Sequence, residues 1–169
     1  MAFLQIDYKS EALMRGVNIK VILPSDGMAG KWEPPYKTLY LLPGYSATAT
    51  ELITYLGLRG QSELKGIAIV LPDGENLFYQ DLPDRMTFYS TYVGKELVEV
   101  TRKMLPLSTK REDTFIGGIS MGGYGALYNG FKYRDTFSKV VAFPPAADAC
   151  MLLAGSEAPG FSRAQFEGI

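Results

Sequence analysis

Short, continuous runs of apolar residues, each ending near a proline or glycine, constrain the fold of this 169-residue chain more than any other feature. Residues 38–42 read Thr-Leu-Tyr-Leu-Leu, and residues 67–71 read Ile-Ala-Ile-Val-Leu. Shorter runs occur at 115–116 and 140–143. Apolar runs of this length are typical of strands buried on both faces, as in a parallel sheet. The pattern therefore predicts an α/β fold with a mostly parallel sheet and helices on both of its faces.

Helices are predicted between these strands. Thr48 and Glu51 have the spacing of a capping box, which predicts a helix that runs to about Leu58. The next helix is marked by apolar residues that share one face, namely Val93, Leu97, Val100 and Met104. A third helix is expected to begin just after Ser120 and to include residues 124–132.

The N-terminal segment has a different pattern. Apolar and polar residues alternate over residues 4–9 and again over 17–21, which predicts an antiparallel strand pair with one solvated face at the edge of the sheet. No internal repeat or linker divides the chain, so residues 1–169 are expected to form a single domain.

Composition excludes several classes of protein. The 17 basic and 18 acidic residues leave a formal net charge of −1, so nucleic-acid and anionic-membrane partners are not expected. No apolar run is long enough to span a membrane and no signal peptide is recognisable, which favours a cytoplasmic location. Histidine is absent and Cys150 is the only cysteine, which excludes a zinc site of the Cys/His type. No metal and no cofactor are expected.

One motif carries the candidate chemistry. Gly118-Ile119-Ser120-Met121-Gly122 fits the G-x-S-x-G pattern of a nucleophile elbow, and it lies between a predicted buried strand and a predicted helix. In such an elbow a serine at a sharp turn projects its hydroxyl clear of the sheet, and the following helix directs its N-terminal amides at developing negative charge. The motif predicts Ser120 as a nucleophile.

Four segments in this order resemble the esterase D-like α/β-hydrolases, and most closely their short-chain (tributyrin-type) esterases. The segments are Leu-Leu-Pro-Gly-Tyr at 41–45, Val-Leu-Pro-Asp-Gly at 70–74, Leu-Pro-Leu-Ser at 105–108 and Gly-Ile-Ser-Met-Gly-Gly-Tyr-Gly-Ala-Leu at 118–127. The resemblance extends to about Ala147. It implies a carboxylic ester hydrolase that acts on short-chain acyl esters, which are small molecules.

The resemblance also implies roles for individual residues. Ser120 would accept the acyl group, and the backbone amides of Met121 and Tyr45 would form the oxyanion hole. Pro43 stands where the family usually has histidine. Tyr79 and Tyr89 belong to aromatic segments that could line an acyl pocket, although an ordinary aromatic core explains them equally well.

The chain departs from the family after Ser120. A complete α/β-hydrolase continues with an acid and then a histidine, but no histidine follows here, and Asp135 and Asp148 come too early to match the acid. The chain thus resembles the N-terminal two-thirds of an esterase, and we expect an incomplete, C-terminally truncated α/β-hydrolase domain. Without a base, this chain alone is expected to be feeble or inactive as an esterase.

Other interpretations stay open. Ser62-Glu63-Leu64-Lys65 fits the S-x-x-K pattern of serine–lysine enzymes but lacks the companion motifs, and an acidic cluster at 73–84 does not have calcium-loop spacing. The chain could instead be a non-catalytic relative that binds an acyl or carbohydrate ligand. It could also be an interaction module, or a homo-oligomer, that pairs through an exposed sheet edge at Val140–Phe143.

Overall fold

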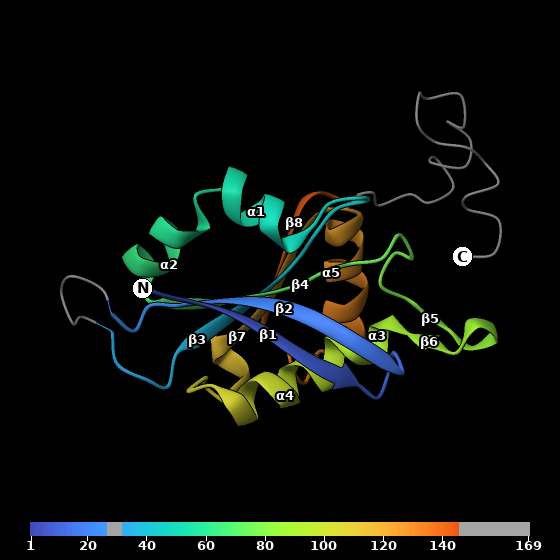
Figure 1. Ribbon diagram of the computed structural model, residues 1–169, viewed down its shortest axis with the longest axis horizontal. Helices are drawn as coiled ribbons and strands as arrows, with labels where there is room; N and C mark the ends of the chain where they lie inside the picture. The colour runs from blue at the N-terminus through green and yellow to red at the C-terminus, as the bar shows by residue number, and fades with distance from the viewer. Residues whose placement is uncertain (27–31, 146–169) are drawn as a thin grey trace.

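Six strands form the central sheet of the computed structural model, which describes residues 1–26 and 32–145 (Figure 1). The strands are arranged in the order β1-β2-β4-β3-β7-β8. Their bounds are β1 Ala2–Ser10, β2 Arg15–Leu23, β3 Lys37–Leu42, β4 Ile67–Pro72, β7 Thr114–Ser120 and β8 Lys139–Pro145.

The strands β4, β3, β7 and β8 run parallel to one another, as the apolar runs predict. β3 pairs in parallel with β4 and with β7, and β7 pairs in parallel with β8. β1 and β2 form the expected antiparallel pair at the edge, and β2 is also antiparallel to β4. Along β1 the exposed and half-buried side chains alternate, because only one face of this edge strand packs on the core. The carboxyl ends of β3, β4 and β7 consequently meet at one edge of the sheet.

Helices cover both faces of the sheet. α1 (Ala49–Tyr55) and α2 (Leu58–Lys65) lie on one side, and α3 (Tyr89–Thr91) and α4 (Leu97–Met104) lie on the other (Figure 1). α5 (Met121–Lys132) shares the core of α3 and α4, because its Ala126 belongs to the same buried cluster as Val93 and Leu97. A smaller buried cluster lies on the other side of the sheet, between the sheet and the helices α1 and α2.

The first helix is shorter than its sequence predicts. Thr48 caps α1 and forms the predicted capping box with Glu51, but α1 ends at Tyr55. Gly57 then adopts a left-handed conformation with φ of 60°, and α2 begins at Leu58. A left-handed residue ends an α-helix, so the single predicted helix is replaced by α1 and the start of α2.

The helix before the nucleophile segment contains a π-helical turn. Residues Tyr92–Glu96 form this turn between α3 and α4. The side chains buried here belong to Val93, Leu97, Val98 and Thr101, whereas Met104 is 52% exposed. Val93 and Leu97 of the predicted face are therefore in the core, whereas Met104, the last residue of α4, is not.

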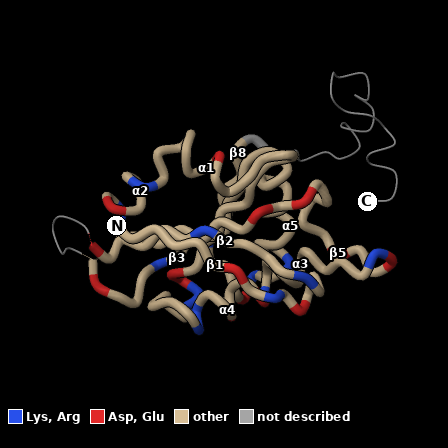
Figure 2. The backbone as a smooth tube through the Cα atoms, viewed as in Figure 1, with Lys and Arg blue, Asp and Glu red and all other residues tan. Residues whose placement is uncertain are grey.

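Short elements complete the described chain. β5 (Asp81–Leu82) and β6 (Thr87–Phe88) form a small hairpin around the 3₁₀ turn Pro83–Arg85, and a second 3₁₀ turn covers Arg111–Asp113. In the part of the chain that the structure describes, no helix is long and apolar enough to cross a membrane. Basic and acidic residues are interspersed along the chain (Figure 2).

Candidate active site

Ser120 lies at the sharp junction between β7 and α5. Its backbone has φ of 55° and ψ of −116°, a region that residues with a side chain rarely adopt. The side chain is exposed and makes no capping hydrogen bond to the helix that follows. Strain at a single exposed serine between a buried strand and a helix is the geometry of a nucleophile elbow. The predicted turn and the predicted helix are both present.

The glycines of the motif allow the chain to cross itself closely. A Cβ at Gly118 would overlap the backbone of Gly122, and a Cβ at Gly122 would overlap the carbonyl groups of Leu42 and Pro43. Because these neighbours are backbone atoms, they have little freedom to move away. The first turn of α5 therefore packs directly against the end of β3, and this packing brings the loop after β3 to the serine.

Met121 is the first residue of α5, and its side chain is buried. The first N–H groups of a helix have no acceptor within the helix, and the helix dipole adds partial positive charge there. A backbone amide at this position is suited to stabilise an oxyanion on a group bonded to Ser120. The oxyanion-hole role of Met121 stays a prediction.

The loop after β3 touches the elbow. A Cβ at Gly44 would lie 3.2 Å from the carbonyl oxygen of Ile119 and 3.5 Å from the Cβ of Ser120. Tyr45 follows and is half-buried against the main core. The structure thus brings Tyr45 and Ser120 to the same edge, although the oxyanion-hole role of the Tyr45 amide also stays a prediction.

The loop after β4 holds this segment in place. Asn76 Oδ1 accepts a hydrogen bond from the Ser46 N–H at 2.7 Å, and Asp73 Oδ1 accepts one from the Ala49 N–H at 2.7 Å. Sequence reasoning missed both supporting residues. Asp73 belongs to a Pro-Asp-Gly turn, and such a turn indicates a loop but not the partner of its carboxylate.

Tyr79 and Tyr89 do not line an open pocket. Tyr79 is 1% exposed and Tyr89 is 2% exposed, and their rings pack edge to face with centroids 6.0 Å apart. The Tyr79 hydroxyl donates to the Pro43 carbonyl oxygen at 2.8 Å, and the Tyr89 hydroxyl accepts from Arg15 at 2.9 Å. Both rings are part of the main core, so the structure gives no support to substrate contact by either one.

Comparison with known proteins identifies the family. Residues 10–165 match the family described as "Putative esterase". The chain belongs to this esterase family. The predicted resemblance and the predicted α/β-hydrolase fold are confirmed.

Individual relatives agree with the family assignment. An acetyl esterase of Caldicellulosiruptor saccharolyticus is 40% identical over 151 residues, which are 86% of this chain and 57% of the relative. An S-formylglutathione hydrolase of Paracoccus denitrificans is 29% identical over 164 residues, 83% of this chain and 56% of the relative. The chain therefore spans a little over half the length of these two relatives.

A solved structure extends the likeness to three dimensions. FphF, a fluorophosphonate-binding serine hydrolase of Staphylococcus aureus, superposes with a TM-score of 0.83 at 29% identity, covering 99% of this chain and 66% of FphF. An S-formylglutathione hydrolase from the same organism gives a TM-score of 0.81 at 28% identity, covering 99% of this chain and 65% of that one.

The residues of the alternative motifs make hydrogen bonds and ion pairs within the fold. Ser62 of the S-x-x-K pattern is fully buried and donates to the Ile67 carbonyl oxygen at 2.8 Å. The acidic residues at 73–84 bond separate partners: Glu75 pairs with Arg15, and Asp81 with Lys132 at 2.9 Å. No metal-binding group of three such side chains occurs among the described residues.

The carboxylates considered for the triad do not complete the site. Asp135 is exposed beyond the C-terminal end of α5, whereas Ser120 precedes its N-terminal end. A helix of twelve residues separates the two positions by about 18 Å. Asp148 and Cys150 lie outside the described residues.

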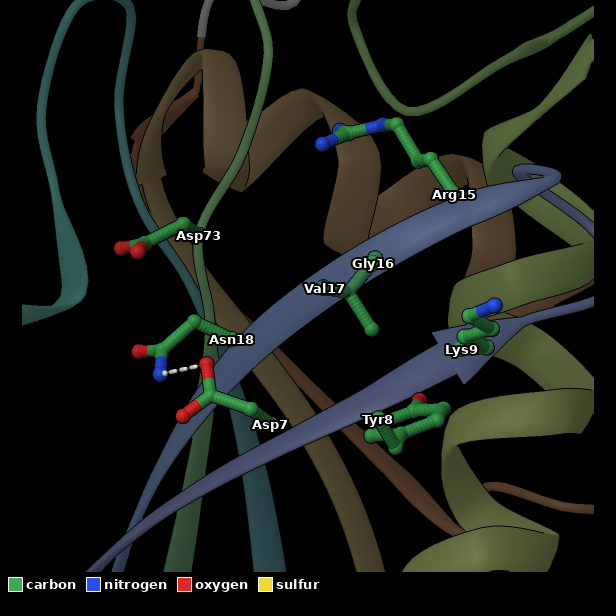
Figure 3. Close-up of a pocket in the computed structure, with 8 residues that line it drawn as sticks. All are labelled: Asp7, Tyr8, Lys9, Arg15, Gly16, Val17, Asn18 and Asp73. Atoms are coloured by element: carbon green, nitrogen blue, oxygen red, sulfur yellow. Dashed lines mark hydrogen bonds between the residues drawn. The ribbon is translucent and has the colours of Figure 1, made fainter.

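One hollow lies on the antiparallel edge of the sheet, and a second lies beside the candidate site. A pocket of about 550 Å³ lies on β1 and β2, where Asn18 and Asp7 are hydrogen-bonded, and Asp73, directly after β4, also lines it (Figure 3). An apolar hollow of about 350 Å³ lies between the loop after β3, α1 and Ile119, the residue before the nucleophile. Tyr45 also lines this second hollow, and Ile119 directly precedes Ser120 in the sequence.

Proposed function

We propose that Ser120 is the nucleophile of a carboxylic ester hydrolase that acts on short-chain acyl esters. The observation that carries this proposal is the backbone of Ser120, which is held in a strained conformation at the exposed junction of β7 and α5. Membership of the esterase family supports it, and the 40% identical relative is an acetyl esterase.

The reaction would proceed in two stages. The Ser120 Oγ forms a bond to the carbonyl carbon of the ester, and the alcohol leaves with a proton as the acyl-enzyme forms. Water then adds to the acyl carbon, Ser120 regains its proton, and the carboxylic acid is released. In both stages the backbone amides of Met121 and Tyr45 would donate to the oxyanion. The net change is ester and water to acid and alcohol.

The apolar hollow beside Ile119 is the candidate for holding the substrate. We propose this hollow in place of the acyl pocket predicted at Tyr79 and Tyr89, because the side chains of both tyrosines are buried in the core. Leu52, Leu56 and Tyr55 contribute to its lining from the region of α1. Its volume of about 350 Å³ is at the lower end of the range for small-molecule sites, which favours short acyl esters.

The test is the intact mass of the protein after exposure to a fluorophosphonate probe. In this reaction an Oγ–P bond forms, the P–F bond breaks, and fluoride and the hydroxyl proton enter the solvent. We expect a single, slowly formed adduct that is absent from Ser120→Ala and retained by Ser25→Ala, a change at an exposed serine outside the site. Unlabelled, folded protein would contradict a reactive Ser120.

The chain should react with the probe but hydrolyse esters only slowly. The chain has no histidine, and general base catalysis contributes about 10²–10⁴-fold. Hydrolysis of p-nitrophenyl acetate by this chain is therefore expected to fall orders of magnitude below that of a complete esterase. Rapid turnover that Ser120→Ala abolishes would instead require another base.

Two other candidate functions are tied to specific observations. A non-catalytic, ligand-binding relative is favoured by the absence of histidine, and it would show thermal stabilisation by an ester without product. An interaction through β8 is favoured by the exposure of Val141 and Phe143, which are 41% and 57% exposed.

A further inference from the structure

The side chain of Tyr79 joins the loop after β4 to the loop that carries Tyr45. Its hydroxyl donates to the Pro43 carbonyl oxygen at 2.8 Å. Asn76 also anchors that loop, but Asn76 is exposed, whereas Tyr79 is 1% exposed. A hydrogen bond shielded from water is electrostatically stronger and costs more to leave unmade. Tyr79 therefore makes a better-protected attachment of the loop than Asn76 does.

The ring of Tyr79 occupies a slot that two glycines leave open. A Cβ at Gly74 would overlap the Tyr79 hydroxyl, and a Cβ at Gly125 would overlap its ring. Gly125 belongs to α5, the helix that begins directly after Ser120. On the same helix, Asn129 Nδ2 donates to the Tyr79 carbonyl oxygen at 3.2 Å. Tyr79 is thus held by the nucleophile helix while it bonds the loop on the other side.

The backbone at this point is strained in a way that directs the ring inward. Phe78 and Tyr79 have successive positive φ values of 54° and 58°. A left-handed conformation is unfavourable for a residue that carries a side chain. Such a conformation persists only where its surroundings hold it, and strained residues gather at functional sites. Here the surroundings are the glycine slot, the Asn129 bond and the Pro43 bond.

The peptide unit between Gly44 and Tyr45 is oriented by a hydrogen bond of its carbonyl group. Gly44 lies against the elbow, and its carbonyl oxygen accepts a hydrogen bond from the Ala47 N–H at 3.2 Å. In a trans peptide the N–H points opposite to the C=O of the same unit. The Tyr45 N–H consequently points away from the turn that closes on Ala47. The direction of the Tyr45 N–H therefore depends on the position of the preceding residues, which include Pro43.

We propose that Tyr79 is a positioning residue, which fixes Pro43 and Gly44 so that the Tyr45 amide is held beside Ser120. This inference rests on the proposed serine esterase function. Burial raises the pKa of the Tyr79 hydroxyl well above its ordinary value, so the group stays a donor over the working pH range. Its effect on the loop should not vary with pH in that range.

The test compares Tyr79→Phe with Tyr89→Phe. Both variants remove one buried hydroxyl from the same aromatic cluster, but only the Tyr79 hydroxyl bonds the loop. For Tyr79→Phe we expect the maximal rate of fluorophosphonate labelling to fall about tenfold, with the concentration for half-maximal rate unchanged. This fall is smaller than the effect of deleting an oxyanion donor outright, because the amide is displaced and not removed. Tyr89→Phe should leave both values unchanged.

Hydrogen exchange supplies a readout that does not need a reactive serine. Amides 44–47 should exchange about tenfold faster in Tyr79→Phe, while Tyr89→Phe leaves them protected. Normal labelling and normal exchange in Tyr79→Phe would overturn the inference and leave the esterase proposal standing. Faster exchange in a protein whose Ser120 never labels would support the positioning role and contradict the esterase proposal. An equal effect of both variants would show general destabilisation and would also overturn the inference.

Discussion

At the scale of single residues, the nucleophile motif could be predicted and the roles of the tyrosines could not. Glycines around Ser120 are needed because backbone atoms cross there, so the requirement is visible in the sequence. Tyr79 lies in the segment between β4 and β5, and nothing in the sequence pattern indicates which way its ring turns. That direction depends on two successive left-handed residues and on a slot formed by Gly74 and Gly125.

Gly122 and Gly60 provide a matched pair that tests the close packing at the elbow. A Cβ at Gly122 would overlap backbone carbonyl groups, whereas a Cβ at Gly60 would meet nothing within 4 Å. Gly122→Ala is expected to lower the free energy of unfolding by about 1–3 kcal/mol. Gly60→Ala, inside α2, should raise it by about 0.5–1 kcal/mol because alanine favours helix.

Urea unfolding of the two variants measures both effects. We expect the two variants to change the free energy of unfolding in opposite directions. Helix propensity favours alanine at both positions, but steric overlap opposes it only at Gly122. A Gly122→Ala variant as stable as the parent would mean that the first turn of α5 does not press on the end of β3.

At the scale of elements, single side chains attach segments that lie far apart in the sequence. Glu96, in the π-helical turn, accepts a hydrogen bond from the Ala12 N–H at 2.7 Å and so fixes the turn between β1 and β2. Periodicity predicts that a helix exists there, but a π turn depends on tertiary contacts. A Cβ at Gly94 would overlap the ring of Tyr133, so the helix packs closely against α5 at this point.

Asp81 attaches the β5–β6 hairpin to two helices. Its carboxylate accepts from the Thr91 N–H at 3.0 Å and from the Lys132 ammonium at 2.9 Å. Partial burial raises the pKa of this carboxyl, but the hydrogen bonds from Thr91 and Lys132 outweigh burial and hold the pKa below its ordinary value of 3.8. Folding therefore favours the charged form of Asp81.

Asp81→Asn is expected to lower the free energy of unfolding at about pH 7 by about 1–2 kcal/mol, because charge-assisted hydrogen bonds are lost. The folded pKa is below the unfolded one, so this stabilisation is complete above the unfolded pKa and disappears as the pH falls through the folded pKa. Urea unfolding over a pH series should show parent and variant converging in acid. Asp84→Asn, in the exposed part of the same hairpin, should behave like the parent at every pH.

At the scale of the whole molecule, the buried apolar runs predict the parallel strands but not their order. β4 pairs with both β3 and β2, and its pairing with β2 is antiparallel. Such a junction depends on which strand edges meet after the crossovers form, and local patterns carry no information about it. The family resemblance rests on local motifs, which explains why the fold and the position of Ser120 were predictable while the supporting contacts of Asp73, Asn76 and Tyr79 were not.

The sheet ends at β8 within the described residues, and this edge leads to a prediction of self-association. β8 pairs with β7 on one side, and no strand among residues 1–26 and 32–145 pairs with its other side. Phe143 is 57% exposed on this strand. Unpaired edge strands with apolar side chains recruit further strands, and a charge on the edge blocks the pairing.

We therefore expect the sedimentation coefficient of the chain to rise with concentration and Phe143→Lys to reduce that rise. Phe131→Lys is the matched control, because Phe131 is 74% exposed but belongs to α5 and not to the edge strand. Equal effects of both changes would indicate general hydrophobic adhesion and not strand pairing. A parent chain that stays monomeric at high concentration would contradict association through β8. Because Ser120 ends the neighbouring strand, association through β8 would occur next to the candidate active site.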